Sequence, residues 1–263
     1  MPILTDKAPL GPSDVSPPSG PGREAARLIP VKGRALWRPA PYLYNRRHSS
    51  CLDFAVSIVD LEAVRRARLA REPFDHLVVP DFIPAAELAA INADYPEIDS
   101  AANHDLEDLR YGPAFARLVE ALRGRELAEA LGAKFGLPLQ QLPVTITVRK
   151  YCERTDGNIH TDHPSKVVTV LVYFNPEWTS PDGRLRLLRS PDDIEDYAVE
   201  VPPLGGTLLA FRRTDHSWHG HTRYVGERRM LQLNFLDRRP WSVASQRVAR
   251  LSTRFVKNVL GLR

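Results

Sequence analysis

The sequence predicts an α+β fold: a jelly-roll core (a double-stranded β-helix) buttressed by N-terminal helices and followed by a C-terminal amphipathic helix. Three observations lead to this prediction. Apolar residues recur at helical spacing before residue 143, short β-rich runs follow one another without helices up to residue 238, and a basic amphipathic stretch comes last. Short strands at such spacing are typical of an antiparallel sandwich or barrel, and the jelly roll is the version that encloses a cavity.

Length and composition fit one globular domain with additional segments. The chain has 263 residues, of which 43% are hydrophobic and 26% charged, which is enough to bury a core. The formal net charge of +4 comes from 36 basic and 32 acidic residues, and no long basic block indicates a nucleic-acid partner. Two cysteines without a paired spacing argue against a disulfide framework. Because neither a signal peptide nor a membrane-spanning run is evident, we expect a cytoplasmic protein of unknown oligomeric state.

The first part of the chain divides into a leader and a helical part. Residues 1–50 combine prolines with glycine, serine and arginine, which predicts a disordered leader, with a docking arm as the alternative. Residues 51–142 should form the helical N-terminal part of the main domain. Within it the spacing predicts helices over 51–71, from Pro84 through Ile91, over 115–122 and over 127–135, with a strand near 74–79.

The predicted jelly-roll core covers residues 143–238. Its strands alternate or remain apolar, and Gly, Pro, Asp and Ser separate them. They are expected at 144–151, 167–174, 184–188, 197–201, 207–211 and 230–236. Residues 239–263 should contain a basic amphipathic helix that packs on the domain, although such a helix could also lie on an anionic membrane.

Three side chains in the predicted core have the chemistry of a metal site. His160 and Asp162 are separated by one residue, so strand alternation would place both on one face. His219, at the start of a later strand, offers a third ligand. Two histidines and one carboxylate form the facial triad of non-haem Fe(II) oxygenases, which leaves coordination positions open. We therefore expect these residues to be both the metal ligands and the catalytic centre.

An arginine at the start of the last strand could hold an acidic co-substrate. A guanidinium presents a rigid fork that matches a carboxylate, and it stays charged. Arg228 shares a strand face with Gln232, whereas Arg229 shares one with Leu231 and Leu233. Polar residues suit a cavity lining, so Arg228 is the predicted clamp. The alternatives, that Arg229 is the clamp or that both arginines are solvated, stay open.

Three further histidines lie near the predicted ligands. His221 follows His219 by two residues and could support the ligand or replace it. His216 has no assigned role. His163 should face away from the site and be structural or exposed.

These motifs resemble the Fe(II)- and 2-oxoglutarate-dependent dioxygenase superfamily, in its prolyl 4-hydroxylase-like branch, over roughly residues 74–236. The resemblance rests on His160-Thr161-Asp162, on His219 and on Gly226-Glu227-Arg228. It implies a cupin-like jelly roll that binds Fe(II), 2-oxoglutarate and O2, with ascorbate as an optional reductant.

The resemblance also implies roles for two tyrosines and a reaction type. Tyr151 and Tyr173 would line the 2-oxoglutarate pocket. The protein would be an enzyme that hydroxylates an unactivated C–H bond and releases succinate and CO2. Two rival functions stay open: a cupin-like metal-binding protein without 2-oxoglutarate chemistry, and a non-catalytic binding or scaffold module.

The sequence leaves the substrate unidentified, either a small molecule or a peptide. Basic residues should flank the mouth of the cavity and would suit an anionic substrate; they are Arg149, Lys150, Arg184 and Arg186. Nucleic acid is not expected as a partner, and membrane contact through residues 242–263 is not favoured.

Overall fold

The structure, a computed structural model, describes residues 57–238. The predicted leader, the start of the predicted helix over 51–71 and the predicted C-terminal helix lie outside these residues. Among the described helices, none combines the length and the apolar character needed to cross a membrane.

Four α-helices precede the main strands, and local signals explain where they begin and end. They are α1 Leu61–Arg66, α2 Ala85–Ala93, α3 Pro113–Arg123 and α4 Arg125–Phe135, with 3₁₀ turns at Leu106–Asp108 and Leu139–Gln141. The Asp60 side chain accepts a hydrogen bond from the Ala63 N–H and so caps α1. Gly136, with φ of 66°, ends α4 in the left-handed conformation that glycine favours. The predicted positions of the last three helices are confirmed.

Within the described residues, the predicted helix over 51–71 is confirmed for Leu61–Arg66 and is wrong before Leu61 and beyond Arg66. The backbone leaves the helical region at Ala67, and Ala70 instead forms an antiparallel bridge with His76. The prediction rested on alanines at helical spacing, but alanine buries little apolar surface. The backbone hydrogen bonds between Ala70 and His76 therefore decide the conformation here.

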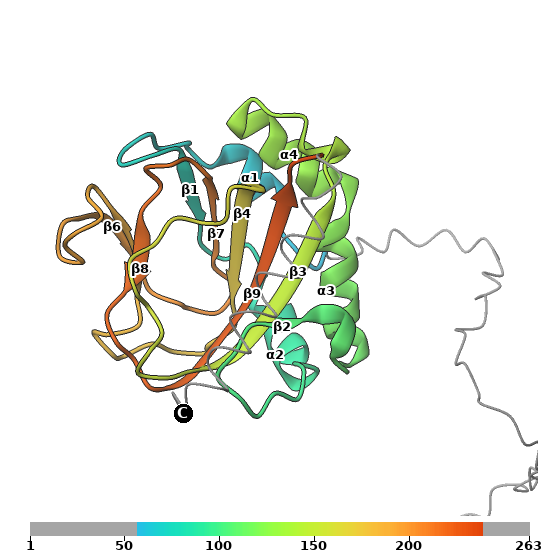
Figure 1. Cartoon of the computed structure of the whole chain (residues 1–263). Coiled ribbons are helices and arrows are strands. Elements are labelled where there is room, and N and C mark those ends of the chain that lie inside the picture. The colour runs from blue at the N-terminus through green and yellow to red at the C-terminus, as the bar shows by residue number, and fades with distance from the viewer. Residues whose placement is uncertain (1–56, 239–263) are drawn as a thin grey trace, which may run out of the picture. The chain divides into compact units, whose positions relative to one another are not determined.

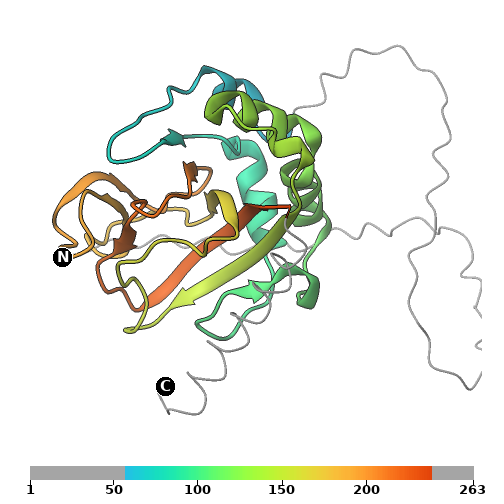
Figure 2. The ribbon, with the colours of Figure 1, turned by 45° about the horizontal axis from the view of Figure 1, so that its top comes forward.

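The strands form two antiparallel sheets, as predicted for a jelly roll (Figure 1). The larger sheet has the order β1-β7-β4-β9-β3-β2, and the smaller one β6-β5-β8. The strands are β1 His76–Val79, β2 His104–Asp105, β3 Val144–Cys152, β4 Lys166–Tyr173, β5 Leu185–Leu188, β6 Tyr197–Val201, β7 Leu208–Arg212, β8 His219–His221 and β9 Gly226–Leu236. All six predicted core strands are present, and β9 begins at Gly226, before the predicted residue 230. The short β2 was not predicted. Figure 2 shows β3 and β9 running side by side along most of their length.

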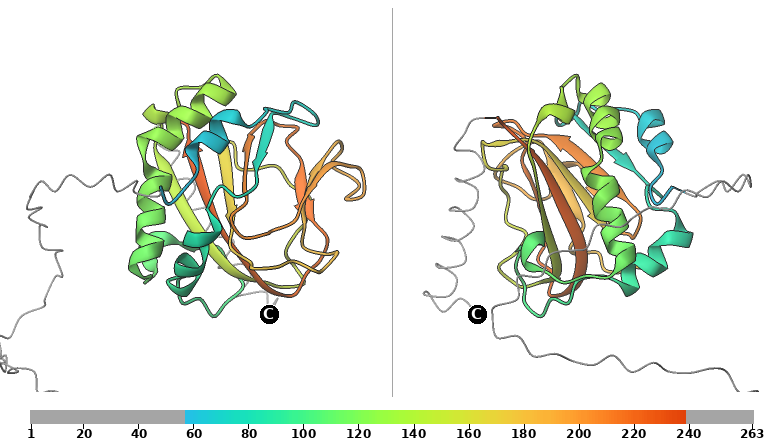
Figure 3. Two further views of the ribbon diagram at one scale, coloured as in Figure 1. Left: turned by 180° about the vertical axis from the view of Figure 1, so that it is seen from behind. Right: turned by 90° about the vertical axis from the view of Figure 1, so that its right-hand side faces the viewer.

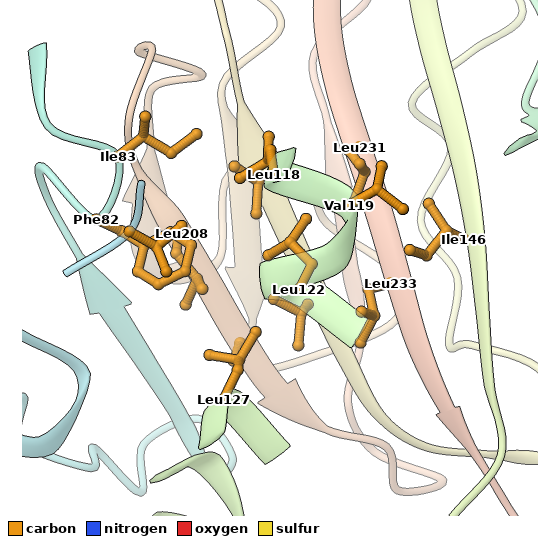
Figure 4. Close-up of a cluster of buried hydrophobic side chains, with 14 of the residues drawn as sticks. Phe82, Ile83, Leu118, Val119, Leu122, Leu127, Ile146, Leu208, Leu231 and Leu233 are labelled. Atoms are coloured by element: carbon orange, nitrogen blue, oxygen red, sulfur yellow. The ribbon is translucent and has the colours of Figure 1, made fainter. Parts of the chain in front are cut away.

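The outer face of the large sheet packs against the helices, which cover that face in both views of Figure 3. Leu118 and Leu122 of α3 and Leu127 at the start of α4 belong to one buried cluster with Ile146 and Leu233 of the sheet, and Figure 4 shows Leu122 next to Leu233. All are at most 1% exposed. Burial of each such side chain contributes about 1.5–3 kcal/mol, so this layer fixes the sheet on one side.

The inner face of the large sheet looks toward the small sheet. Tyr173 of β4 is paired with Met230 of β9, and both pack in a second apolar cluster with Leu187 of β5 and Phe211 of β7. Strand alternation thus sends successive residues of β4 and β9 either to the helices or to the space between the sheets.

Truncation of the outer layer should destabilise the fold. Leu118→Ala removes a fully buried side chain between α3 and the sheet, and we expect the free energy of unfolding to fall by about 2–5 kcal/mol. Urea denaturation measures the change. The exposed Val225 is a control, because Val225→Ala should change stability by less than about 0.5 kcal/mol. Equal losses in the two variants would contradict the packing described.

Candidate metal and co-substrate site

The predicted metal ligands converge. His160, Asp162 and His219 each offer a ligand atom, and these atoms all lie within 4.8 Å of one another. Strand alternation is not what joins them, because residues 161–162 are not in a strand. Instead, His160 forms an isolated antiparallel bridge with His219, with N–H···O distances of 3.0 Å in both directions. The sequence predicted the grouping correctly but attributed it to the wrong geometry.

Backbone carbonyls orient both imidazoles of this group. His160 Nδ1 lies 2.8 Å from the carbonyl oxygen of Asn158, and His219 Nδ1 lies 2.9 Å from that of Ser217. A carbonyl oxygen only accepts hydrogen bonds, so each Nδ1 must carry the hydrogen. The Nε2 lone pair of each ring is then available to a metal, as in the supporting contacts of known metal sites.

Two donors hold the Asp162 carboxylate. The Lys166 ammonium lies 2.6 Å from Oδ1, and the Thr169 hydroxyl donates to Oδ2 at 2.5 Å. Burial alone would raise the pKa of Asp162, but the charge of Lys166 and these hydrogen bonds hold it well below its usual range. Asp162 is therefore an anion before any cation arrives.

Two buried histidines stay neutral at ordinary pH. Burial lowers the pKa of His219 to about 4, although the nearby Asp162 opposes the shift. Burial and the charge of Arg228 lower the pKa of His221 to about 4. A neutral imidazole is the form that binds a metal, so His219 needs no deprotonation to act as a ligand.

A cavity of about 340 Å³ opens beside this group. The three candidate ligands line it, together with Arg228 and Met230 of β9. Leu171, Leu185 and Phe211 add apolar surface to the wall. The cavity therefore joins a potential metal site to a guanidinium through a partly apolar space.

Arg228 ends in this cavity with an unused donor. The residue is 2% exposed; its Nε donates to the carbonyl of Gly183 at 2.7 Å, and its Nη1 lies 3.2 Å from the sulfur of Met230. Among the described residues, two buried side-chain polar atoms lack a hydrogen-bond partner: Arg228 Nη2 and the hydroxyl oxygen of Tyr173. The guanidinium lies 5.4 Å from the centre of the Tyr173 ring. Burial without a partner is costly, so two such groups side by side indicate a site for an acceptor such as a carboxylate.

The Tyr173 hydroxyl is a donor in this arrangement. Burial raises its pKa, and the charge of Arg228 only partly opposes that shift. The phenol therefore keeps its proton and can donate a hydrogen bond beside the guanidinium.

Comparison with known families agrees with this geometry. Residues 146–236 match the model of the 2OG-Fe(II) oxygenase superfamily. This core belongs to that superfamily. Its members are oxidoreductases that use Fe(II), 2-oxoglutarate and O2, so the superfamily predicted from the motifs is confirmed. The group of His160, Asp162 and His219 has the donor set that such an iron requires.

Several solved structures are similar to the oxygenase. A prolyl-4-hydroxylase from Pseudomonas putida shares 18% identity, with 68% of this chain and 93% of that chain covered and a TM-score of 0.45. A prolyl 4-hydroxylase from Phytophthora capsici shares 20% identity, with 68% and 66% covered and a TM-score of 0.47. An oxidoreductase of the 2OG-Fe(II) oxygenase family from Burkholderia pseudomallei shares 16% identity, with 61% and 84% covered and a TM-score of 0.42. No curated protein matches the chain by sequence.

Arg229 lies on the opposite face of β9 of the oxygenase. Its guanidinium stacks 5.4 Å from the ring centre of Tyr95, donates to Asn92 Oδ1 at 3.2 Å and pairs with Glu227. It therefore contacts the helical side of the sheet, while Arg228 faces the cavity, as alternation predicted.

The structure does not bring Tyr151 to the cavity. The register between β3 and β9 shifts between Arg149 and Tyr151, and the residues of β3 that line the cavity are Arg149 and Cys152. The Lys150 ammonium lies 5.3 Å from the centre of the Tyr151 ring. A bulge reverses the alternation beyond it, so strand parity counted from sequence fails at this point.

The other histidines occupy different surroundings. His221 lines the cavity, and its Nδ1 lies 2.8 Å from the Thr222 carbonyl. His163 and His216 are exposed. His221 thus belongs to the cavity wall, beside the candidate ligands.

Of the basic residues expected at the cavity mouth, only Arg149 lines the cavity. Arg186 pairs with Glu195 at 2.5 Å and with Glu200 at 2.8 Å, and Arg184 pairs with Glu200 at 3.3 Å. These two arginines are thus balanced by acidic partners on the small sheet.

Sequence reasoning missed the two residues that hold Asp162. Lys166 begins β4, and Thr169 is the polar residue inside its otherwise apolar run of valines and leucines. The hydroxyl of Thr169 is fully buried and therefore needs a hydrogen-bond partner. A lone threonine in an apolar strand could thus have indicated a polar partner in the cavity.

The neutral histidines make stability depend on pH. Their pKa values of about 4 in the folded state lie below the ordinary 6.5, so the unfolded chain binds more protons between these values. Metal-free protein should therefore lose stability as the pH falls from 6.5 to 4, by up to about 1.4 kcal/mol per pH unit for each histidine. Asp162 adds little in this window, because its stabilisation is lost only below the usual pKa of 3.8.

Urea denaturation at several pH values, with a chelator present, measures this slope. His221→Gln should make the slope shallower, and the exposed His216→Gln should leave it unchanged. Identical slopes in wild type and His221→Gln would contradict the burial argument for His221.

Proposed function

We propose that the protein is an Fe(II)- and 2-oxoglutarate-dependent dioxygenase that hydroxylates an unactivated C–H bond of a small molecule or peptide. The overall reaction is R–H + 2-oxoglutarate + O2 → R–OH + succinate + CO2. One observation supports it most: Arg228, whose Nη2 lacks a partner, lines the same cavity as the two-histidine, one-carboxylate group, and its guanidinium lies over the ring of Tyr173.

In this proposal His160, Asp162 and His219 hold the metal. The carboxylate is already ionised and the imidazole of His219 already neutral, so neither of these two ligands has to lose a proton on binding. Three protein ligands leave further positions for co-substrate and oxygen. When bound, Fe(II) would supply the redox chemistry that couples loss of CO2 from 2-oxoglutarate to oxidation of the C–H bond.

The spacing of two residues on β4 supports an anion site beside the proposed metal site. Thr169 contacts Asp162, whereas Tyr173 lies beneath Arg228, and the two residues are four positions apart on β4. Alternation sends both side chains to the same face of the strand. A five-carbon dicarboxylate bound to the metal at one end would extend along this face toward the guanidinium.

Part of the wall between these two ends is apolar. Leu171 of β4 and Met230 of β9 lie on the inner face there, opposite Leu185 of the small sheet. Apolar side chains next to Arg228 lower the local dielectric, which strengthens a charge interaction with the guanidinium.

Anaerobic titration with Fe(II) and 2-oxoglutarate tests the proposal. Chelation of the metal by the keto acid should give a weak visible charge-transfer band, and the band should be absent in His160→Ala. Wild-type protein that binds iron yet shows no band would favour a metal-binding protein without 2-oxoglutarate chemistry.

Adjacent arginines provide a matched comparison for the co-substrate site. Arg228→Met should weaken 2-oxoglutarate binding by about 10–100-fold, because a charge-assisted hydrogen bond contributes about 1.5–3 kcal/mol. Arg229→Met removes the same charge from the opposite face of β9 and should have little effect on that affinity. Iron affinity should change little in either variant. Equal 2-oxoglutarate affinity in the two variants would rule out Arg228 as the clamp.

A further inference from the structure

We propose that the ion pair between Arg149 and Asp156 positions the loop that carries the ligand His160. The loop comprises residues 153–159, between β3 and His160, and is called the 153–159 loop below. The proposal depends on the proposed function only through the assignment of His160 as a metal ligand. Arg149 and Asp156 are positioning residues in this account, since they act on the metal through His160.

The ion pair is short and buried in the cavity wall. Arg149 Nη1 lies 2.6 Å from Asp156 Oδ2, and the two side chains are only 13% and 9% exposed. Arg149 Nε also donates to Asn103 Oδ1 at 3.0 Å. One guanidinium on β3 thus connects the segment before β2 to the 153–159 loop.

The same carboxylate closes the turn at the start of the loop. Asp156 Oδ2 accepts a hydrogen bond from the Glu153 N–H at 2.9 Å, and the Asp156 N–H donates to the Glu153 carbonyl at 2.9 Å. Displacement of Asp156 from Arg149 would therefore disturb the backbone of the turn as well as one side chain.

Beyond Asp156, backbone contacts lead directly to the metal group. The His221 N–H donates to the Gly157 carbonyl at 3.0 Å, and His160 pairs with His219. Gly157 has φ of 94°, and a Cβ there would lie 2.4 Å from the carbonyl oxygen of His221. Only glycine allows the loop to approach β8 this closely. The position of His160 relative to His219 thus depends on the path of the loop.

The loop has no apolar anchor of its own. Its one large apolar side chain, Ile159, is only half-buried. Segments with few buried contacts open easily, so polar contacts must fix this one. The Arg149–Asp156 pair is a buried ionic contact of this kind.

Stability alone does not account for such a pair. Removing two charges from water costs about as much as their attraction returns, and replacement by apolar residues is often neutral or stabilising. What a buried pair does provide is one defined geometry, because any other arrangement leaves a charge without its partner. At this place the geometry being defined is that of the first metal ligand.

The test uses Arg149→Met, Asp156→Asn and the double variant, all measured first without metal. Hydrogen exchange at the His160 and His221 amides, followed by NMR, reports on the pairing of the loop with β8. We expect each single variant to raise these rates at least about tenfold, because a buried charge that has lost its partner favours local opening of the loop. Unchanged rates at both amides in the single variants would overturn the proposal.

The second readout is affinity for Co²⁺ or Mn²⁺, measured by calorimetry. Each single variant should bind the metal about 10–100-fold more weakly. The double variant, which leaves no unpaired charge, should lose no more than the weaker-binding single variant, because both substitutions remove one interaction. Losses that multiply in the double variant would contradict a shared role.

Two controls separate positioning from general stability. Arg184→Met removes an ion pair with Glu200 on the small sheet and should leave exchange and metal affinity unchanged. Arg149→Lys retains the charge and should restore part of the metal affinity lost in Arg149→Met. If Arg184→Met lost as much metal affinity as Arg149→Met, the loss would reflect general destabilisation of the protein, and the proposal would be overturned.

Failure of the proposed role of the ion pair can be told apart from failure of the proposed function. Amide exchange is read in metal-free protein and requires no 2-oxoglutarate. If the charge-transfer band were missing while the amide exchange rates and metal affinities changed as expected, the result would count against the oxygenase reaction and not against the role of the ion pair.

Discussion

The alternation of β4 and β9 in the middle of the large sheet is the constraint on which the rest of the structure depends. Both strands are buried on both faces, so every residue must suit either the helical layer or the space between the sheets. Val170 and Leu233 serve the first requirement, and Tyr173 and Arg228 the second. A slip of one residue would exchange the two sets and place apolar side chains in the cavity.

Electrostatics in the cavity follow from this burial. In a medium of low dielectric, a carboxylate such as Asp162 requires nearby donors, and Lys166 and Thr169 supply them. Near the other end, Arg228 and Tyr173 each carry a hydrogen-bond donor without an acceptor, so positive charge and donors are in excess there. The cavity is therefore prepared for a cation at one end and an anion at the other.

Sequence reasoning succeeded where structure is regular. The α2, α3 and α4 helices and the core strands were predicted from periodicity, and Arg228 was separated from Arg229 because adjacent residues of a strand point to opposite faces. The chemistry and spacing of the residues located the candidate triad, although its side chains meet through a backbone bridge between His160 and His219 instead of a shared strand.

The failures occurred where tertiary contacts override local pattern. Alanine spacing predicted a helix as far as residue 71, but backbone pairing of Ala70 with His76 determines the conformation there. Tyr151 was assigned to the cavity from the family resemblance, and a matching position in the sequence cannot reveal the shift in register between β3 and β9. The need of Asp162 for Lys166 becomes visible only when the segment between them is folded into a turn.

The helical side of the large sheet also affects the cavity, through hydrogen bonds from the phenol of Tyr95 to the backbone of the strands. The hydroxyl of Tyr95 donates to the carbonyl of Arg149 at 2.7 Å and lies 3.1 Å from that of Met230, beside the shift in register. Burial raises the pKa of Tyr95 well above its ordinary value, so this donor keeps its proton. A side chain on the helical face of the sheet thus fixes the backbone at Arg149. A substitution of Tyr95, on the face remote from the cavity, would therefore change the direction in which the Arg149 side chain enters the cavity.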